Sequence, residues 1–289
     1  MGYGAGGVLV ALLLLVGACA GPPPQERVST RPVESRTALL RLFPRAEECR
    51  SCHLQHYQEW SQSMHARSLT TPGVRGNLQN YLPEVRQKKG RVNRSDLMAC
   101  FRCHAPALQW ASDQVVAEVA EAVAQGRGEA LAGLEVTCSI CHSMRDGEVH
   151  PMGQTRTAYG PIRDPASNPY HSSTYSAGHA TGQFCQRCHE WVPPNPPNVP
   201  CTMVYNDWAK SHAAQAGVAC QSCHMDPRMG VAARGGPLRQ VHGHLMPGGH
   251  HEGMLKRAVE LDLVPTREGE QVRVAVGVRN LAPHRVPDS

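Results

Sequence analysis

Ten of the 12 Cys residues fall into five identical units in which two Cys flank two other residues and a His follows directly. Two thiols at this spacing lie on one helical turn and can reach the two vinyl groups on one edge of a porphyrin. The imidazole that follows then points at the iron as its proximal ligand. The units are Cys49–Cys52–His53, Cys100–Cys103–His104, Cys138–Cys141–His142, Cys185–Cys188–His189 and Cys220–Cys223–His224.

Two other uses of paired cysteines explain this pattern less well. Zinc ribbons use pairs of Cys-x-x-Cys, but zinc does not require a His after every second Cys, and five pairs leave one pair over. Disulfides in an exported chain would leave the five His unexplained. The pattern therefore predicts five covalently attached haem c groups, with the iron bound by His53, His104, His142, His189 and His224.

Eleven of the 16 His lie outside the five units, which favours haems closed on both faces by imidazole. His65 follows Trp60 and Ser63, in a segment predicted to be a helix over residues 54–68. His212 follows Trp208 and Ser211 in a similar segment. Both are predicted to be distal ligands. His56, three residues after His53, is interpreted as a residue near the haem or at the surface.

Composition supports a chain wrapped around cofactors. Phe, Tyr and Trp make up only 5% of the residues, too little aromatic volume for an ordinary core of 289 residues, and Gly and Pro together contribute 50 residues. The formal net charge is +5. Because Lys and Arg are scattered, with the densest run at residues 86–89 expected in a polar loop, we expect no nucleic-acid partner.

The N-terminus has the pattern of an export signal. An apolar stretch over residues 8–16 precedes small residues and Cys19, and it is too short to span a membrane. We predict a signal peptide over residues 1–18, lipidation of Cys19 and a Pro-rich tether over residues 19–45. An ordinary secretory signal with Cys19 as a bystander is the alternative.

The rest of the chain reads as a mainly α-helical protein with extensive loops. We predict a five-haem domain over residues 46–254, in which residues 113–125 form the clearest amphipathic helix. Apolar residues alternate with polar ones on both sides of Gly269, which predicts a short β-hairpin within residues 255–289. Either the chain is a truncated member of its class or this hairpin packs on the haem core.

The chain resembles the multihaem cytochromes c related to the tetrahaem cytochrome c of ammonia oxidisers, and related penta- and octahaem cytochromes. The resemblance spans residues 46–289 and rests on the Trp-Ser-His segments and on residues 159–164, 217–225, 244–249 and 272–287. It implies that His171, His244 and His284 are distal ligands beside His65 and His212. His284 departs from the family pattern, because Arg285 and Val286 follow it. Rivals are His179, His242, His250 and His251.

Function is expected to be electron transfer between a membrane or periplasmic donor and an acceptor, through haems mostly ligated by two His. Redox proteins and a membrane, through the lipid anchor, are the expected partners, on the periplasmic side or at the cell surface. The alternative is an oxidoreductase that acts on a small nitrogen or sulfur oxyanion at a five-coordinate haem. Related nitrite reductases carry a Lys in place of one motif His, and no such motif occurs here.

Overall fold

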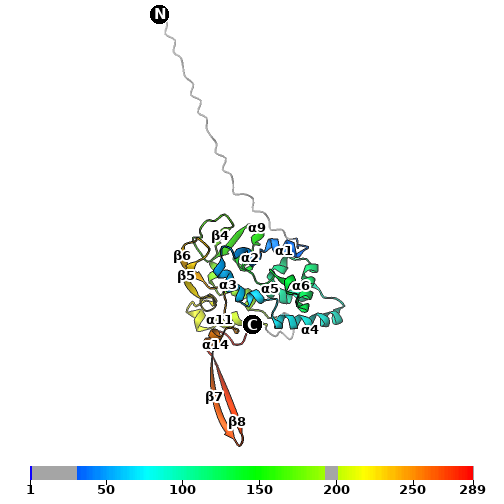
Figure 1. Ribbon diagram of the computed structural model, residues 1–289, viewed down its shortest axis with the longest axis vertical. Helices are drawn as coiled ribbons and strands as arrows, with labels where there is room; N and C mark the ends of the chain where they lie inside the picture. Colours follow the sequence, from blue (N-terminus) through cyan, green and yellow to red (C-terminus); the bar gives the residue numbers. More distant parts are fainter. Residues whose placement is uncertain (2–30, 193–200, 289) are drawn as a thin grey trace.

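The computed structural model describes Met1 and residues 31–192 and 201–288. The predicted signal peptide, Cys19 and the first part of the predicted tether lie outside these ranges. Helices and long connections dominate the molecule, and the strands form only two-stranded sheets (Figure 1). The predicted fold class, mainly α with extensive loops and a short C-terminal β-hairpin, is confirmed. None of the described helices is long and apolar enough to cross a membrane.

The N-terminal half, residues 33–143, is built from helices. They are α1 (Arg36–Leu42), α2 (Ala46–Cys49), α3 (Leu54–Gln62), the 3₁₀ helix η1 (His65–Arg67), α4 (Pro72–Lys89), α5 (Arg94–His104), η2 (Pro106–Trp110), α6 (Asp113–Gln125), α7 (Gly128–Leu131) and α8 (Cys138–His142).

A core of buried side chains holds this half together. The predicted amphipathic helix is present as α6, which buries Val116 and Val119 on one face and ends at Gly126, whose φ of 69° suits a left-handed cap. α5, whose last turn carries Cys100–His104, buries Leu97 and Phe101 against the same cluster. The second haem motif is therefore anchored in packed apolar side chains.

Two predictions about the N-terminal half were wrong. The tether was expected to reach residue 45, but Val33 pairs with Ala111, and Leu39 and Phe43 are fully buried. The apolar side chains of α1 therefore place this helix in the packed core, so it is not part of the predicted tether. The basic residues 86–89 form the last turn of α4 instead of a loop, where positive charge is favourable at a helix C-terminus.

The C-terminal half, residues 144–288, is a series of short elements. They are β1 (Met144–Arg145), β2 (Glu148–Val149), α9 (Met152–Thr155), β3 (Thr157–Gly160), β4 (Ser172–Tyr175), η3 (Ala177–Ala180), α10 (Gln183–His189), α11 (Val204–Ala209), α12 (His212–Gln215), α13 (Cys220–His224), β5 (Pro227–Val231), β6 (Leu238–His242), α14 (Glu252–Ala258), β7 (Val259–Glu268) and β8 (Gln271–Asn280).

The predicted hairpin is formed by β7 and β8, which pair antiparallel with Leu261 opposite Val278 and Leu263 opposite Val276. It projects away from the body (Figure 1). Leu261 and Val278 are 62% and 66% exposed. Of the two alternatives for this segment, packing on the haem core is not seen in the described residues, because the apolar side chains of the hairpin are largely exposed.

Candidate haem-binding sites

Each of the five motifs is presented by a helix or a helix end. We number the sites 1 to 5 after the motifs in chain order. In site 1, Cys49 ends α2 and His53 precedes the first turn of α3. The motifs of sites 2 and 4 form the ends of helices α5 and α10. The motifs of sites 3 and 5 form the single-turn helices α8 and α13. The ten motif thiols form no disulfide in the described structure, so all are available for covalent attachment.

Four of the five motif histidines face a second imidazole across a nearly constant gap. Ring centroids lie 6.2 Å apart for His53 and His171, with planes inclined by 24°. The distance is 6.3 Å at 19° for His142 and His244. It is 6.1 Å at 89° for His65 and His189.

The fourth pair lies at site 5. His224 and His284 lie 6.3 Å apart with planes inclined by 28°. A metal–imidazole bond of about 2 Å on each side, plus roughly 1 Å from each nitrogen to its ring centre, separates two axial rings by about 6 Å. All four pairs match that separation, so their residues fit an iron between them.

Backbone carbonyls fix the orientation of most of these rings through Nδ1. His53, His142 and His224 donate from Nδ1 to the carbonyls of Ala232, Tyr159 and Pro247, each at 2.7 Å. Such bonds leave Nε2 for a metal and define the tautomer.

Three of the rings that face motif histidines also donate from Nδ1 to a backbone carbonyl. Nδ1 of His244 donates to the carbonyl of His242 at 2.9 Å, and Nδ1 of His284 donates to the carbonyl of Arg285 at 2.9 Å. His171 donates to Ser172 at 3.0 Å. The rings are thus held with their free nitrogens available for an iron.

Burial keeps two of the imidazoles that face a motif histidine neutral, which is the form that binds metal. Burial lowers the pKa of His65 to about 4, with the neighbouring His189 as the second cause. Burial also lowers the pKa of His244 to about 3, helped by His142 and His56. Both side chains are therefore unprotonated at neutral pH.

Site 2 differs from the other four. All 16 His belong to the described residues, and none of their rings pairs with His104 at the spacing seen above. Nδ1 of His104 donates to the carbonyl of Ser68 at 2.9 Å, so this ring is oriented like the other proximal imidazoles. Site 2 is a proximal site without a facing histidine.

His212 was predicted to be a distal ligand, and the structure places it at the surface, at the start of α12. Across the described residues, its ring pairs with no proximal imidazole. Ser63 and Ser211 occupy equivalent positions, but His65 is two residues after its Ser and His212 only one. One residue rotates a side chain by about 100° around a helix axis, so the two imidazoles point in different directions.

The rivals named from sequence differ in which ring nitrogen is hydrogen-bonded. His179 lies 5.8 Å from His142, and its Nε2 donates to the carbonyl of Cys141 at 3.2 Å, so that only its buried Nδ1 is left for a metal. His242 donates from Nδ1 to the carbonyl of Met225, as the paired rings do to their carbonyls, but in the described structure its ring faces no motif imidazole. His56 contacts the ring of His244 edge-on at 4.6 Å and lies between sites 1 and 3.

Thiols of different motifs contact one another and so give the spatial order of the sites. Cys49 of site 1 lies beside Cys138 of site 3, where α2 packs on α8. Site 4 contacts two neighbours, through Cys188 with Cys103 of site 2 and through Cys185 with Cys220 of site 5. Cys141 of site 3 interacts electrostatically with both thiols of site 4.

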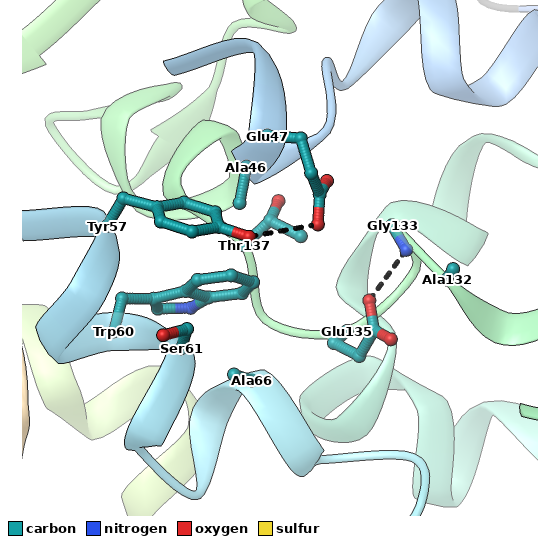
Figure 2. Close-up of a pocket in the computed structure, with 10 residues that line it drawn as sticks. All are labelled: Ala46, Glu47, Tyr57, Trp60, Ser61, Ala66, Ala132, Gly133, Glu135 and Thr137. Carbon is teal, nitrogen blue, oxygen red and sulfur yellow. Dashed lines mark hydrogen bonds between the residues drawn. The ribbon is translucent and has the colours of Figure 1, made fainter. Parts of the chain in front are cut away.

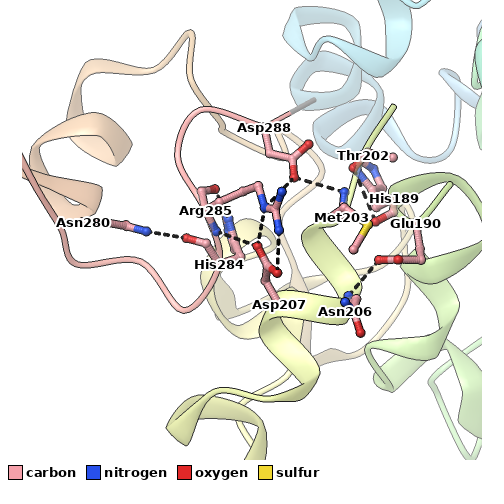
Figure 3. A network of polar contacts seen from close by, with 10 residues as sticks. All are labelled: His189, Glu190, Thr202, Met203, Asn206, Asp207, Asn280, His284, Arg285 and Asp288. Carbon is pink, nitrogen blue, oxygen red and sulfur yellow. Dashed lines mark hydrogen bonds and ion pairs between the residues drawn. The ribbon is translucent and has the colours of Figure 1, made fainter. Parts of the chain in front are cut away.

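Acidic residues near the distal histidines were not singled out from sequence. Glu59 forms an ion pair with Arg228 and accepts a hydrogen bond from the backbone N–H of His244 at 2.8 Å. Asp207 binds Arg285, the residue after His284, through a fork of two bonds at 2.6 and 3.0 Å (Figure 3). A sequence signal for both is that each acid directly precedes a Trp.

A cavity of about 210 Å³ lies beside sites 1 and 3 (Figure 2). Tyr57 and Trp60 of α3 form one wall, and Glu47 accepts a hydrogen bond from the Tyr57 hydroxyl at 3.5 Å. Glu135 lies on the opposite side, and burial raises its pKa. Thr137, which precedes Cys138, also lines the cavity.

Comparison with known proteins agrees with this geometry. Residues 48–143, which hold sites 1 to 3, match the family model described as cytochrome c554 and c-prime. The fold is similar to the crystal structure of a penta-haem cytochrome c552 from Thermochromatium tepidum, with a TM-score of 0.56 and 24% identity, over 86% of this chain and 68% of that one. No curated protein is significantly similar in sequence. The predicted resemblance to multihaem cytochromes c is therefore supported by the family model over residues 48–143 and by the similarity of the fold.

Proposed function

We propose that the chain is an exported electron carrier that holds five haem c groups, four of them between two imidazoles. The observation that carries the proposal is the set of four histidine pairs with centroids 6.1–6.3 Å apart. An iron enclosed by two imidazoles has no free position for a substrate, so its role is to accept and release electrons. The penta-haem content of the structurally similar cytochrome supports the number of groups.

The roles of the chain's residues follow from the pairs. The motif Cys residues attach the haem groups, and the motif His residues are the proximal ligands. The distal ligands are His171 for site 1, His244 for site 3, His65 for site 4 and His284 for site 5. Haem c supplies one-electron chemistry when bound. The carbonyl groups that accept from Nδ1 hold each ring and raise its basicity, which tunes the reduction potential.

The thiol contacts support a route for the electrons. Site 1 adjoins site 3, site 3 adjoins site 4, and site 4 adjoins sites 2 and 5. We therefore infer that electrons pass along the order 1, 3, 4, 5, with site 2 as a branch at site 4. Site 5, at the end of that order, includes the half-exposed α13 and the exposed Cys223, where a redox partner can approach.

The proposal is tested by the mass of the mature protein and by a reductive titration. Expression in a host that matures c-type cytochromes is expected to yield a mass increase of five haems and an uptake of five electrons per chain, one for each motif. Fewer than five attached groups, or an uptake of fewer electrons than groups, would contradict it.

A second function is favoured by His104 alone. Because no imidazole faces it, site 2 is the place where an open coordination position would allow a small molecule to bind, as the oxidoreductase alternative requires. The chain would then deliver electrons to that molecule through site 4, whose Cys188 contacts Cys103.

Carbon monoxide tests this second function. The reduced protein is expected to bind one carbon monoxide per chain, and a variant with Cys100→Ala and Cys103→Ala is expected to bind none. The matched control is Cys49→Ala with Cys52→Ala, which removes site 1 and leaves carbon monoxide binding in place. No binding by the wild-type protein would restrict the chain to electron transfer.

Export and a lipid anchor at Cys19 are part of the proposal. The apolar stretch before Cys19 and the Pro-rich residues after it are the supporting sequence features. Cys19→Ser is expected to release the protein from the membrane fraction without changing its haem content, whereas an unchanged membrane fraction would contradict the anchor.

A further inference from the structure

Two distant segments share one sequence pattern and one local structure. Both read Tyr-x-acid-Trp-x-x-Ser, at residues 57–63 and 205–211, and we call them unit A and unit B. The Tyr and Trp rings lie 5.8 Å apart in unit A and 5.5 Å apart in unit B, both inclined by 45°. The Ser hydroxyl of each unit accepts a backbone N–H three residues later at 3.3 Å.

The Trp of each unit binds the backbone that leads into a haem motif. Nε1 of Trp60 donates to the carbonyl of Val136 at 2.9 Å, and Nε1 of Trp208 donates to the carbonyl of Val218 at 2.9 Å. Val136 precedes Cys138 by two residues, and Val218 precedes Cys220 by two residues. Each indole therefore fixes the same point on the proximal side of its site, which is site 3 for unit A and site 5 for unit B.

The acid of each unit binds the segment that carries the distal histidine of the same site. Glu59 accepts from the backbone N–H of His244 at 2.8 Å. Asp207 accepts from the backbone N–H of Arg285 at 3.3 Å as well as from its guanidinium group (Figure 3). Each acid is balanced by one Arg, which is Arg228 in unit A and Arg285 in unit B.

We propose that units A and B are clamps, each of which sets the distance between the proximal and distal sides of one haem site. Trp60 and Glu59 are adjacent, so one helical turn of α3 holds both sides of site 3; Trp208 and Asp207 do the same for site 5 from α11. These four are positioning residues that touch the backbone of the ligand segments. The inference rests on the proposed ligation of sites 3 and 5.

The clamp has a specific consequence for ligand exchange. If the acid is removed, the distal imidazole loses its backbone support and yields more readily to an incoming ligand. Loss of such outer-shell partners typically weakens metal binding by about 10–100-fold. Glu59→Ala is therefore expected to accelerate carbon monoxide binding at site 3 by roughly that factor, and Asp207→Ala to do the same at site 5.

The experiment compares the holoprotein variants Glu59→Ala, Trp60→Phe, Asp207→Ala and Trp208→Phe by electron paramagnetic resonance and by carbon monoxide binding after reduction. His244→Ala and His284→Ala identify the signals of sites 3 and 5. Each clamp variant is expected to change the signal of its own site only. Glu59→Gln, which keeps an acceptor for the His244 N–H, is expected to restore much of the wild-type signal.

Trp110→Phe is the matched control, because this Trp packs on Phe43 in the N-terminal core and belongs to neither unit. A change at sites 3 and 5 in this control equal to that in Trp60→Phe, or no change in any clamp variant that carries five haems, would overturn the clamp. A His244→Ala protein that keeps every low-spin signal would instead overturn the ligand assignment, and the clamp at site 3 with it.

Discussion

The two halves of the molecule are stabilised in different ways. Of the 25 hydrophobic residues that are buried in the described structure, 23 lie between residues 39 and 140, and only Tyr159 and Val241 lie beyond. Yet residues 144–288 contain two of the five motifs and three of the four proposed distal histidines. The first half therefore has a core made of side chains, whereas we expect the second half to be held together by its proposed haem sites.

The small number of buried apolar side chains in residues 144–288 indicates which contacts the proposed haem groups would replace. A chain buries apolar surface to offset the entropy lost on folding, and residues 144–288 bury little of it by themselves. On the proposed function, haem groups held between α10, α13 and the segments that carry His171, His244 and His284 would supply the missing apolar contacts. In the second half we expect the haem groups to act both as redox cofactors and as the apolar core. In the first half we expect them to act mainly as redox cofactors.

The largest effect is expected when haem attachment is prevented. Protein made without cytochrome c maturation should lose ordered structure throughout residues 144–288 but keep helical structure in α4 and α6, which bury their own side chains. Hydrogen exchange measured by mass spectrometry checks this. Equal loss of protection in both halves would remove the distinction between them.

A smaller but still large effect is expected from a cavity in the first half. Leu97→Ala, at a residue that is 1% exposed, should lower the free energy of unfolding by about 2–5 kcal/mol. Chemical denaturation of the holoprotein, followed by far-ultraviolet circular dichroism, measures this change. A cost below about 1 kcal/mol would mean that side chains contribute little even in the N-terminal half.

The helix that carries site 2 should respond to acid through Asp96. Lys89 and the N–H of Asn93 bind this carboxylate, and the first of these bonds is the larger cause of its lowered pKa. Since the pKa is lower in the folded chain, the stabilisation is present above the unfolded pKa of about 4 and is lost as the pH falls through the folded pKa.

Asp96→Asn is therefore expected to flatten the loss of stability below about pH 4, and Asp96→Ala to cost about 1 kcal/mol at neutral pH. Denaturation at several pH values checks both changes. An Asp96→Asn protein with the same acid dependence as the wild type would show that the carboxylate contributes nothing to the packing of the first half.

The smallest effect is expected in the hairpin. Leu261→Ala, at a side chain that is 62% exposed and lies on the projecting β7, should change the free energy of unfolding by less than about 0.5 kcal/mol. The same denaturation experiment measures it. A cost near that of Leu97→Ala would show that the hairpin packs against something in solution.

Local signals in the sequence were enough for several features. The period of Val115–Val123 predicted α6, and the alternation on both sides of Gly269 predicted the hairpin. Each of these depends on residues that are close together in the chain.

Long-range pairing could not be predicted in the same way. His65 faces His189 from 124 positions away, and Glu59 meets Arg228 across 169 positions, so no local pattern identifies either partner. His212 was predicted by analogy with His65, but a difference of one residue in its spacing from Ser211 turns it elsewhere. The likeness of units A and B extends to their Tyr, acid, Trp and Ser, and not to their His.

Electron paramagnetic resonance of the fully oxidised protein is the most direct test of the central claim. Three pairs with planes inclined by 19–28° predict three rhombic low-spin signals, and the His65–His189 pair at 89° predicts one strongly anisotropic low-spin signal. His104 without a facing imidazole predicts one high-spin signal. Five low-spin signals, or no strongly anisotropic signal, would contradict the assignment of four paired sites and one open site.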